Sequence, residues 1–316
     1  MDLSFVIPCY RSEKTIELVY QELVSVLSAK KNYTYEIILV NDSSPDNVME
    51  IMEKLAHNDK KVKVVDFAKN MGKHAALMAG FKVSRGDYVV CLDDDGQCPV
   101  DQLWKLINPL KHGYDVSMAQ YGTKKQSKFK NFGSKMNDWM MTTMLGKPKD
   151  FQFANFAAMK KFVVKEMIKY DNPYSYVNGL ILRTTQNIIN VPMEERERAY
   201  GTGGYTFFKS LKLWLNGYTA FSITPLRVST LFGLIFAASG FIFSIIIIIR
   251  KLLKPEILSG YTSLMGILLL ISGIIMLMLG ILGEYVGRIY MCINQSPQYV
   301  IRRTINLDKE KGMDNM

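Results

Sequence analysis

The sequence is poor in the residues that build thiolate metal sites and disulfide frameworks. It has three histidines and four cysteines, none in C-x-x-C spacing, at Cys9, Cys91, Cys98 and Cys292. This pattern argues against both a zinc site and a disulfide network, and it is typical of a reducing compartment. The N-terminus also lacks a basic segment followed by a long apolar run, so we expect no cleaved signal peptide.

A nucleic-acid-binding module is missing too, although the net charge is +10. A basic balance suits nucleic acid, an anionic membrane surface or a phosphate-bearing substrate. Because no basic stripe interleaved with aromatic residues lies on a soluble module, we exclude nucleic acid as a partner. A lipid bilayer and phosphate remain as explanations of the charge.

Charged residues are absent from two long apolar stretches, 229–249 and 264–282. Each is long enough to cross a bilayer core of about 30 Å as a helix. A buried helical hairpin in a soluble protein is the alternative. Two spans would place both ends of the chain on one side, and the basic flanks and free cysteines favour the cytoplasm. At the end of the second stretch, Glu284 and Arg288 are spaced for an i,i+4 ion pair.

The first hundred residues alternate strand and helix patterns. Short apolar runs bounded by polar clusters predict buried strands at Leu3–Pro8, Tyr35–Asn41, Val62–Phe67 and Asp87–Leu92. Helices are predicted after Ser12, after Asn41 with Ser44 as cap and Pro45 in the first position, and over Gly72–Val83. Repeated βα units predict an α/β fold with a mostly parallel sheet.

Two further segments combine aromatic and basic residues at helical spacing. One runs from Phe129 to Met144 and the other over Tyr205–Phe221. Each is compatible with an amphipathic helix on a membrane surface. For the first segment, packing against the sheet is an equal alternative.

An acidic cluster, Asp93-Asp94-Asp95-Gly96-Gln97, directly follows the fourth predicted strand. An exposed acidic turn is one explanation. However, the carboxyl ends of strands are where α/β sheets bind ligands. Alternating carboxylates with a nearby amide oxygen are also ligands that Mg²⁺ or Mn²⁺ prefers. The Asp-x-Asp pattern therefore predicts a divalent-metal site.

Polar turns also follow the other three predicted strands: Pro8-Cys9-Tyr10, Asn41-Asp42-Ser43-Ser44 and Asn70-Met71-Gly72-Lys73. Taken singly, each could be a simple βα turn, but together with the acidic cluster they would form the crevice that a nucleotide requires. The glycine-rich run 201–204 lies far from the first strand–helix turn, which argues against a dinucleotide-binding oxidoreductase.

In the order of these motifs the chain resembles glycosyltransferase family 2. The motifs are Ile7-Pro8-Cys9-Tyr10, Val40-Asn41-Asp42-Ser43-Ser44-Pro45-Asp46, Asn70-x-Gly72-Lys73 and Asp93-x-Asp95-Gly96-Gln97-x-Pro99. More narrowly it is similar to the polyprenyl-phosphate glycosyltransferases, through Arg198-x-x-Gly201, Gly204-Tyr205-Thr206, Pro225-Leu226-Arg227 and Gly283-Glu284-Tyr285-x-Gly287-Arg288.

The resemblance implies a GT-A fold, Mg²⁺ or Mn²⁺ as cofactor, a UDP-sugar donor with glucose as the default, and an undecaprenyl or related polyprenyl phosphate as acceptor. It implies a catalytic domain over 1–204, a juxtamembrane amphipathic segment over 205–228, two transmembrane helices over 229–290 and a cytoplasmic tail over 291–316. We also expect a homo-oligomer in the cell membrane.

The resemblance also implies roles for matching residues. The nucleotide sugar would contact Pro8, Tyr10, Glu13, Asp42, Lys73, Asp93 and Asp94. The metal would be held by Asp93, Asp95 and Gln97. The acceptor phosphate would lie near Lys124, Lys125 and Asn155, and the catalytic residues would be Asp93, Asp95 and Arg198.

The chain departs from the subgroup at the acceptor side, where the usual Asp-Phe-Arg is Asn155-Phe156-Ala157. A phosphate monoester has a second pKa of about 6, so the acceptor is largely a dianion at neutral pH and needs little help from a base. Asn155 is therefore compatible with activity. Two alternatives stay open: a polysaccharide synthase, although its Gln-x-x-Arg-Trp motif is missing, and a non-catalytic membrane scaffold that retains the fold.

Overall fold

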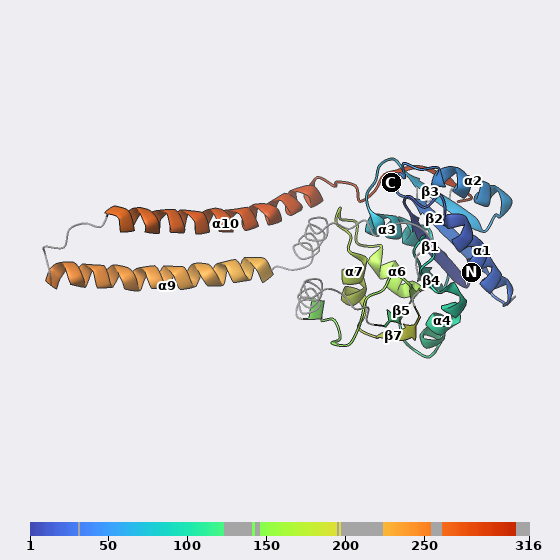
Figure 1. Ribbon diagram of the computed structural model, residues 1–316, viewed down its shortest axis with the longest axis horizontal. Helices are drawn as coiled ribbons and strands as arrows, with labels where there is room; N and C mark the ends of the chain where they lie inside the picture. The colour runs from blue at the N-terminus through green and yellow to red at the C-terminus, as the bar shows by residue number, and fades with distance from the viewer. Residues whose placement is uncertain are drawn as a thin grey trace. The chain divides into compact units, whose positions relative to one another are not determined.

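The computed structural model of the protein describes residues 1–30, 32–122, 141–142, 146–194, 196, 224–253 and 261–307 (Figure 1). The chain divides into two compact units. The first comprises Met1–Leu211 together with Ser296–Met316, and the second comprises Lys212–Gln295.

The first unit is built on an eight-stranded sheet with the order β7-β5-β6-β4-β1-β2-β3-β8. The strands are β1 (Leu3–Cys9), β2 (Tyr35–Asn41), β3 (Val62–Phe67), β4 (Tyr88–Cys91), β5 (Val116–Tyr121), β6 (Ala157–Lys160), β7 (Ile188–Met193) and β8 (Ile301–Ile305). The four strands β4, β1, β2 and β3 are mutually parallel, whereas β6 and β8 run antiparallel to their neighbours. The predicted α/β fold with a mostly parallel sheet is confirmed.

Helices cover both faces of this sheet (Figure 1). They are α1 (Ile16–Ser28), α2 (Val48–Asn58), α3 (Lys73–Val83), the 3₁₀ turn η1 (Val100–Gln102), α4 (Leu103–Lys111), α6 (Lys161–Met167) and α7 (Val177–Thr184). Phe5 and Ile7 of β1 join a core cluster with α1, α2 and α4. Val6, on the opposite face, meets α3 at Gly80. Because both faces are buried, the sequence of β1 is apolar without alternation.

The start of α2 differs from the prediction. This helix begins at Val48 after Asn47, not at Pro45. The Ser44 hydroxyl, predicted to cap it, donates to Asp46 Oδ1 at 2.5 Å and accepts the Arg11 N–H at 2.7 Å. A tertiary partner on the β1 loop therefore replaces the helix end as the partner of Ser44.

The second unit contains two packed helices, α9 (Thr224–Leu253) and α10 (Tyr261–Ile293). Among the described residues, the stretch Leu270–Ile293 is long and apolar enough to cross a membrane, with a mean hydropathy of 1.9 and no burial within the protein. Helix α9 contributes a shorter apolar stretch, 228–242. Such exposure argues against a hairpin buried in a soluble core. The predicted span 229–249, in α9, stays a prediction. The predicted Arg288–Glu284 ion pair is present at 2.7 Å.

The C-terminal residues, predicted as a cytoplasmic tail over 291–316, include a strand of the sheet. Helix α10 continues to Ile293, and Ile301–Ile305 then form β8. This strand pairs antiparallel with β3, with Thr304 opposite Val65 and Arg303 opposite Asp66. The segment after the hairpin therefore completes one edge of the sheet.

Candidate active site

The loops after β1, β2, β3 and β4 lie at one edge of the sheet, because these strands are parallel neighbours. The loops are joined by hydrogen bonds. The Tyr10 N–H donates to Asp94 Oδ2 at 3.0 Å, which links the β1 and β4 loops. The Asn70 side chain donates to the Asp42 carbonyl at 3.1 Å, which links the β3 and β2 loops. The Arg11 N–H donates to Ser44 Oγ at 2.7 Å and joins the β1 and β2 loops, so the four predicted turns form one connected group.

Asp42 is the central link between the loops after β2 and β3. Its carboxylate accepts the Met71 N–H at 2.7 Å and the Gly72 N–H at 2.9 Å. Its own N–H donates to the Cys9 carbonyl at 3.1 Å. Burial raises the pKa of Asp42, and the two N–H donors act in the opposite direction. Asp42 therefore holds the loops after β1, β2 and β3 together, and its contact with a nucleotide stays a prediction.

The three residues predicted on the β1 side differ in accessibility. Pro8 is buried inside β1, whereas Tyr10 is 43% exposed. Glu13 is half-buried, and its carboxylate accepts the Asn47 N–H at 3.2 Å. Of the three, Tyr10 offers an open aromatic surface to a ligand.

Asp93 is held between a cation and an amide. Lys73, the first residue of α3, forms an ion pair with Oδ1 of Asp93. The Asn155 side-chain amide donates to Oδ2 at 2.6 Å. This meeting follows from the antiparallel pairing of β4 with β6, which sets Cys91 opposite Ala157. Asn155, predicted to face the acceptor phosphate, thus contacts the acidic cluster.

The other two acids of the cluster have different surroundings. Burial raises the pKa of Asp94 to about 6, although the Tyr10 N–H opposes the shift. Asp95 Oδ1 accepts the Gln97 N–H at 3.1 Å. The Gln97 side chain donates to the Arg196 carbonyl at 3.3 Å. Three consecutive acids therefore play three separate structural roles.

Arg196 is a contributor that the sequence did not reveal. Its guanidinium forms ion pairs with Glu22 of α1 and Asp101 of η1, both at 2.5 Å. Its N–H and carbonyl bond to Gln97. These partners are distant in sequence, so no local pattern marks the residue.

The acidic cluster supplies too few protein ligands to enclose a metal by itself. Across the described residues, no group of three or more His, Cys, Asp or Glu side chains is arranged to hold an ion. Mg²⁺ is usually held by one or two carboxylates plus substrate phosphates and waters. Asp93 and Asp95 fit that arrangement if a diphosphate completes the coordination.

Several predicted residues lie outside the described part of the chain. They are Lys124, Lys125 and Arg198, together with most of the first aromatic–basic segment and all of the second, 205–221. Their roles stay predictions.

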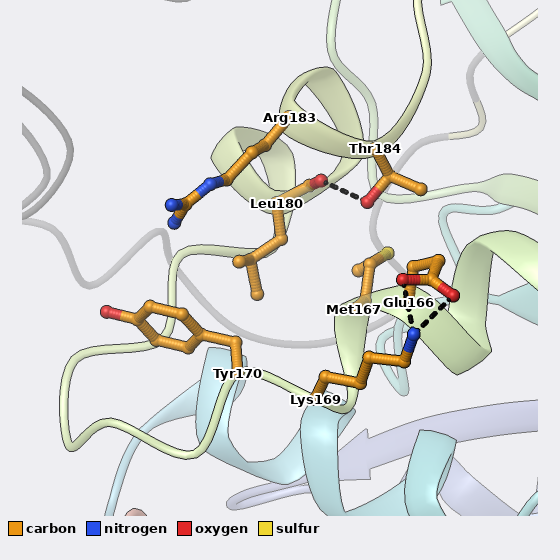
Figure 2. Close-up of a pocket in the computed structure, with 7 residues that line it drawn as sticks. All are labelled: Glu166, Met167, Lys169, Tyr170, Leu180, Arg183 and Thr184. Atoms are coloured by element: carbon orange, nitrogen blue, oxygen red, sulfur yellow. Dashed lines mark hydrogen bonds and ion pairs between the residues drawn. The ribbon is translucent and has the colours of Figure 1, made fainter.

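A separate cavity of about 440 Å³ lies at α6 and α7 (Figure 2). Its lining includes Tyr170, Leu180 and Arg183, and Glu166 forms an ion pair with Lys169 beside it. None of the predicted site residues lines it. The predicted chemistry therefore does not involve the lining of this cavity.

Comparison with known proteins agrees with this geometry. Residues 4–168 match the family described as glycosyl transferase family 2, and residues 224–289 match the GtrB C-terminal hairpin. The glycosyltransferase YkcC of Bacillus subtilis is 31% identical over 312 residues, covering 98% of this chain and 95% of the relative. The undecaprenyl-phosphate 4-deoxy-4-formamido-L-arabinose transferase of Proteus mirabilis is 29% identical over 311 residues, covering 97% and 95%.

Among solved structures, glucosyl-3-phosphoglycerate synthase from Mycobacterium tuberculosis, crystallised with Mn²⁺, uridine diphosphate and phosphoglyceric acid, aligns with a TM-score of 0.52. The identity is 17%, and the match covers 68% of this chain and 75% of the synthase. At this identity the similarity concerns the fold, which is of the GT-A type.

Proposed function

The chain belongs to glycosyltransferase family 2, and from this we propose that it transfers a sugar from a nucleoside diphosphate to a polyprenyl phosphate. Curated relatives that match along almost their whole length are named as undecaprenyl-phosphate sugar transferases. We propose UDP as the nucleotide, glucose as the first sugar to test and undecaprenyl phosphate as the acceptor. The product would be a lipid-linked sugar for modification of cell-envelope glycans.

One observation carries this proposal for the site. Asp93 lies at the edge where the loops of four parallel strands meet, and Lys73 forms an ion pair with its carboxylate. A carboxylate can help to hold a divalent cation that also binds phosphate oxygens. A neighbouring lysine ammonium group can pair with the same phosphates directly. The two side chains together therefore suit a diphosphate. The exposed Tyr10 ring offers a stacking surface for the base on the same edge.

In the proposed reaction an acceptor phosphate oxygen attacks the anomeric carbon of the sugar, and the bond from that carbon to the diphosphate oxygen breaks with inversion. A Mg²⁺ or Mn²⁺ ion held by Asp93, Asp95 and Gln97 would neutralise charge on the departing diphosphate. Lys73 adds a fixed positive charge. Because the acceptor is largely a dianion, Asn155, Lys124, Lys125 and Arg198 need only orient it.

We further propose that α9 and α10 anchor the enzyme in the cell membrane, with the catalytic domain and both termini in the cytoplasm. The exposed apolar side chains of both helices support this, among them Leu234 at 68% and Met276 at 71% exposure. The division into 1–204, 205–228, 229–290 and 291–316 and the homo-oligomer also belong to the proposal.

The proposal is tested with membranes that contain the full chain. They are incubated with radiolabelled UDP-, GDP- and dTDP-sugars and a short polyprenyl phosphate, and the lipid product is extracted. We expect one donor class to label the lipid. Labelled polymer instead of lipid would favour a polysaccharide synthase, and no labelled product with any donor would favour a scaffold.

A matched pair of variants tests the metal assignment. Asp95→Ala should abolish metal-dependent transfer while membrane insertion is retained. Asp87→Ala is the control, because Asp87 is an exposed acid that precedes the opposite, amino end of β4. Full transfer by Asp95→Ala would refute the metal assignment.

A further inference from the structure

A buried carboxylate lies near the carboxyl end of β3. Asp66 is 2% exposed, and a buried charge is costly unless it is compensated. Arg303 of β8 contacts Asp66 Oδ2 through Nε at 3.4 Å, and Arg302 lies 3.9 Å from the same oxygen. Within the described part of the chain, both cations that contact Asp66 come from β8.

Hydrogen bonds connect Asp66 to the loops after β2 and β1. Its Oδ1 accepts the Asn41 side-chain amide at 2.8 Å, and Asn41 Oδ1 in turn accepts the Ser44 N–H at 3.1 Å. Ser44 Oγ accepts the Arg11 N–H. A continuous series of contacts therefore runs from β8 through β3 to the loops that carry Asp42 and Tyr10.

The residue type at position 41 suits this arrangement. An asparagine amide donates to Asp66, whereas an ionised aspartate at the same place would oppose one carboxylate to another. The asparagine at position 41 thus matches the buried acid on the neighbouring strand.

A second connection reaches the loop after β3. The Ala68 N–H donates to the Val300 carbonyl at 2.9 Å, and the Ala68 carbonyl accepts Arg302 Nη2 at 3.1 Å. Tyr299 stacks on Phe67 with ring centroids 5.2 Å apart. The same loop donates the two N–H groups that hold Asp42.

We propose that residues 299–305, here called the C-terminal clasp, position the loops after β2 and β3 for nucleotide binding, with Arg303 as the positioning residue. Arg303 also pairs with Glu53 of α2 at 2.5 Å, so it joins β8 to both β3 and α2. The inference rests on the proposed function, because it assigns the nucleotide to these loops. Its structural part, loop ordering by the clasp, can be measured without any ligand.

The test uses the full-length chain in detergent. Arg303→Met keeps much of the side-chain volume and removes the charge, and Arg303→Lys keeps the charge. Arg183→Met, an exposed arginine on α7, is the matched control. Hydrogen–deuterium exchange of segments 41–46 and 68–72 is followed together with UDP binding in the presence of Mn²⁺.

We expect Arg303→Met to accelerate exchange in both segments and to raise the Kd for UDP by about tenfold. Arg303→Lys should restore part of each effect, and Arg183→Met should match the wild type. In the double variant Asp66→Asn/Arg303→Met, the loss should be smaller than the sum of the single losses, because the neutral residue no longer needs the arginine.

Three outcomes separate the possibilities. Unchanged exchange in both segments of a folded Arg303→Met chain refutes the clasp. If that variant does not fold, Arg303→Lys and Asp66→Asn decide, and wild-type exchange and UDP affinity in both refute it. A wild-type chain that binds none of UDP, GDP and dTDP refutes the proposed function instead. The exchange data still test whether the clasp orders the two loops, because they need no ligand.

Discussion

The side-chain amide of Asn155 donates a hydrogen bond to the Asp93 carboxylate across 2.6 Å, and Lys73 pairs with the other oxygen of the same group. The amide at position 155 therefore contributes a donor where the resemblance to the polyprenyl-phosphate glycosyltransferases implies an acid. An acid there would bring another negative charge against Asp93. This relationship gives two predictions about metal and nucleotide binding.

Asn155→Asp should strengthen metal binding without strongly accelerating transfer. A third carboxylate would join Asp93 and Asp95, so we expect Mn²⁺ affinity of the nucleotide-free chain to rise by about tenfold. Turnover should not rise sharply, because the acceptor phosphate needs no base. Mn²⁺ titration by electron paramagnetic resonance and steady-state transfer measure the two effects, with Asn155→Ala as the control. Sharply higher turnover would contradict the role assigned to the dianion.

Lys73→Gln should weaken nucleotide binding far more than folding. The ion pair with Asp93 is partly exposed, so its loss should change the free energy of unfolding by less than about 1 kcal/mol. Loss of a charged donor to a diphosphate should raise the Kd for UDP by about tenfold. Calorimetric titration and thermal unfolding separate the effects. Lys69→Gln, at an exposed position three residues before Gly72, the N-cap of α3, should leave both unchanged. Equal UDP affinity in Lys73→Gln would rule out the contact.

Asp94→Asn should stabilise the chain at alkaline pH. Burial raises the pKa of Asp94 from 3.8 to about 6, so the folded protein favours the protonated acid. Its favourable contribution is complete below the unfolded pKa and is lost as the pH rises through about 6. The neutral amide avoids that loss, and it can still accept the Tyr10 N–H. Thermal unfolding of the metal-free chain should show a higher midpoint for the variant at pH 8 and a smaller difference at pH 4. A difference that does not vary with pH would contradict this account.

Gly80→Ala should destabilise the packing of α3 on β1. A methyl group at this position would lie 2.2 Å from Val6 Cγ1, and such overpacking costs about 1–3 kcal/mol. The second substitution Val6→Ala should restore part of the loss by making space. Gly122→Ala is the control, because a methyl group there meets nothing within 4 Å. Thermal unfolding midpoints give the comparison, and an unaffected Gly80→Ala chain would show that the two elements can separate without cost.

Much of the catalytic fold was predictable because its signals are local. Tyr35–Asn41 and Val62–Phe67 form strands with the predicted bounds, since short runs rich in apolar residues are typical of parallel strands buried on both faces. The start of α2 was not predictable in this way. Ser44 and Pro45 carry a good capping signal, but Arg11 of another loop takes the Ser44 hydroxyl.

The location of the site was predictable from the sequence, whereas the contacts between its side chains were not. Parallel strands bring their carboxyl ends to one edge, so the four turns had to meet. Which acid faces which partner depended on residues far away in sequence: Asp94 meets the Tyr10 N–H, and Asp93 meets Asn155. Consecutive side chains of a turn point in different directions, and composition alone does not say which is which.

Local patterns were thus enough for the alternating βα units, the acidic turn and the apolar hairpin, because each depends on residues that are neighbours along the chain. The position of the last strand depended on the folded chain. Ile301–Ile305 is a short run with two arginines, and its backbone and charged groups find their partners in β3, 237 residues earlier for Arg303 and Asp66. A strand of this length has little stability until a sheet edge supplies its hydrogen bonds.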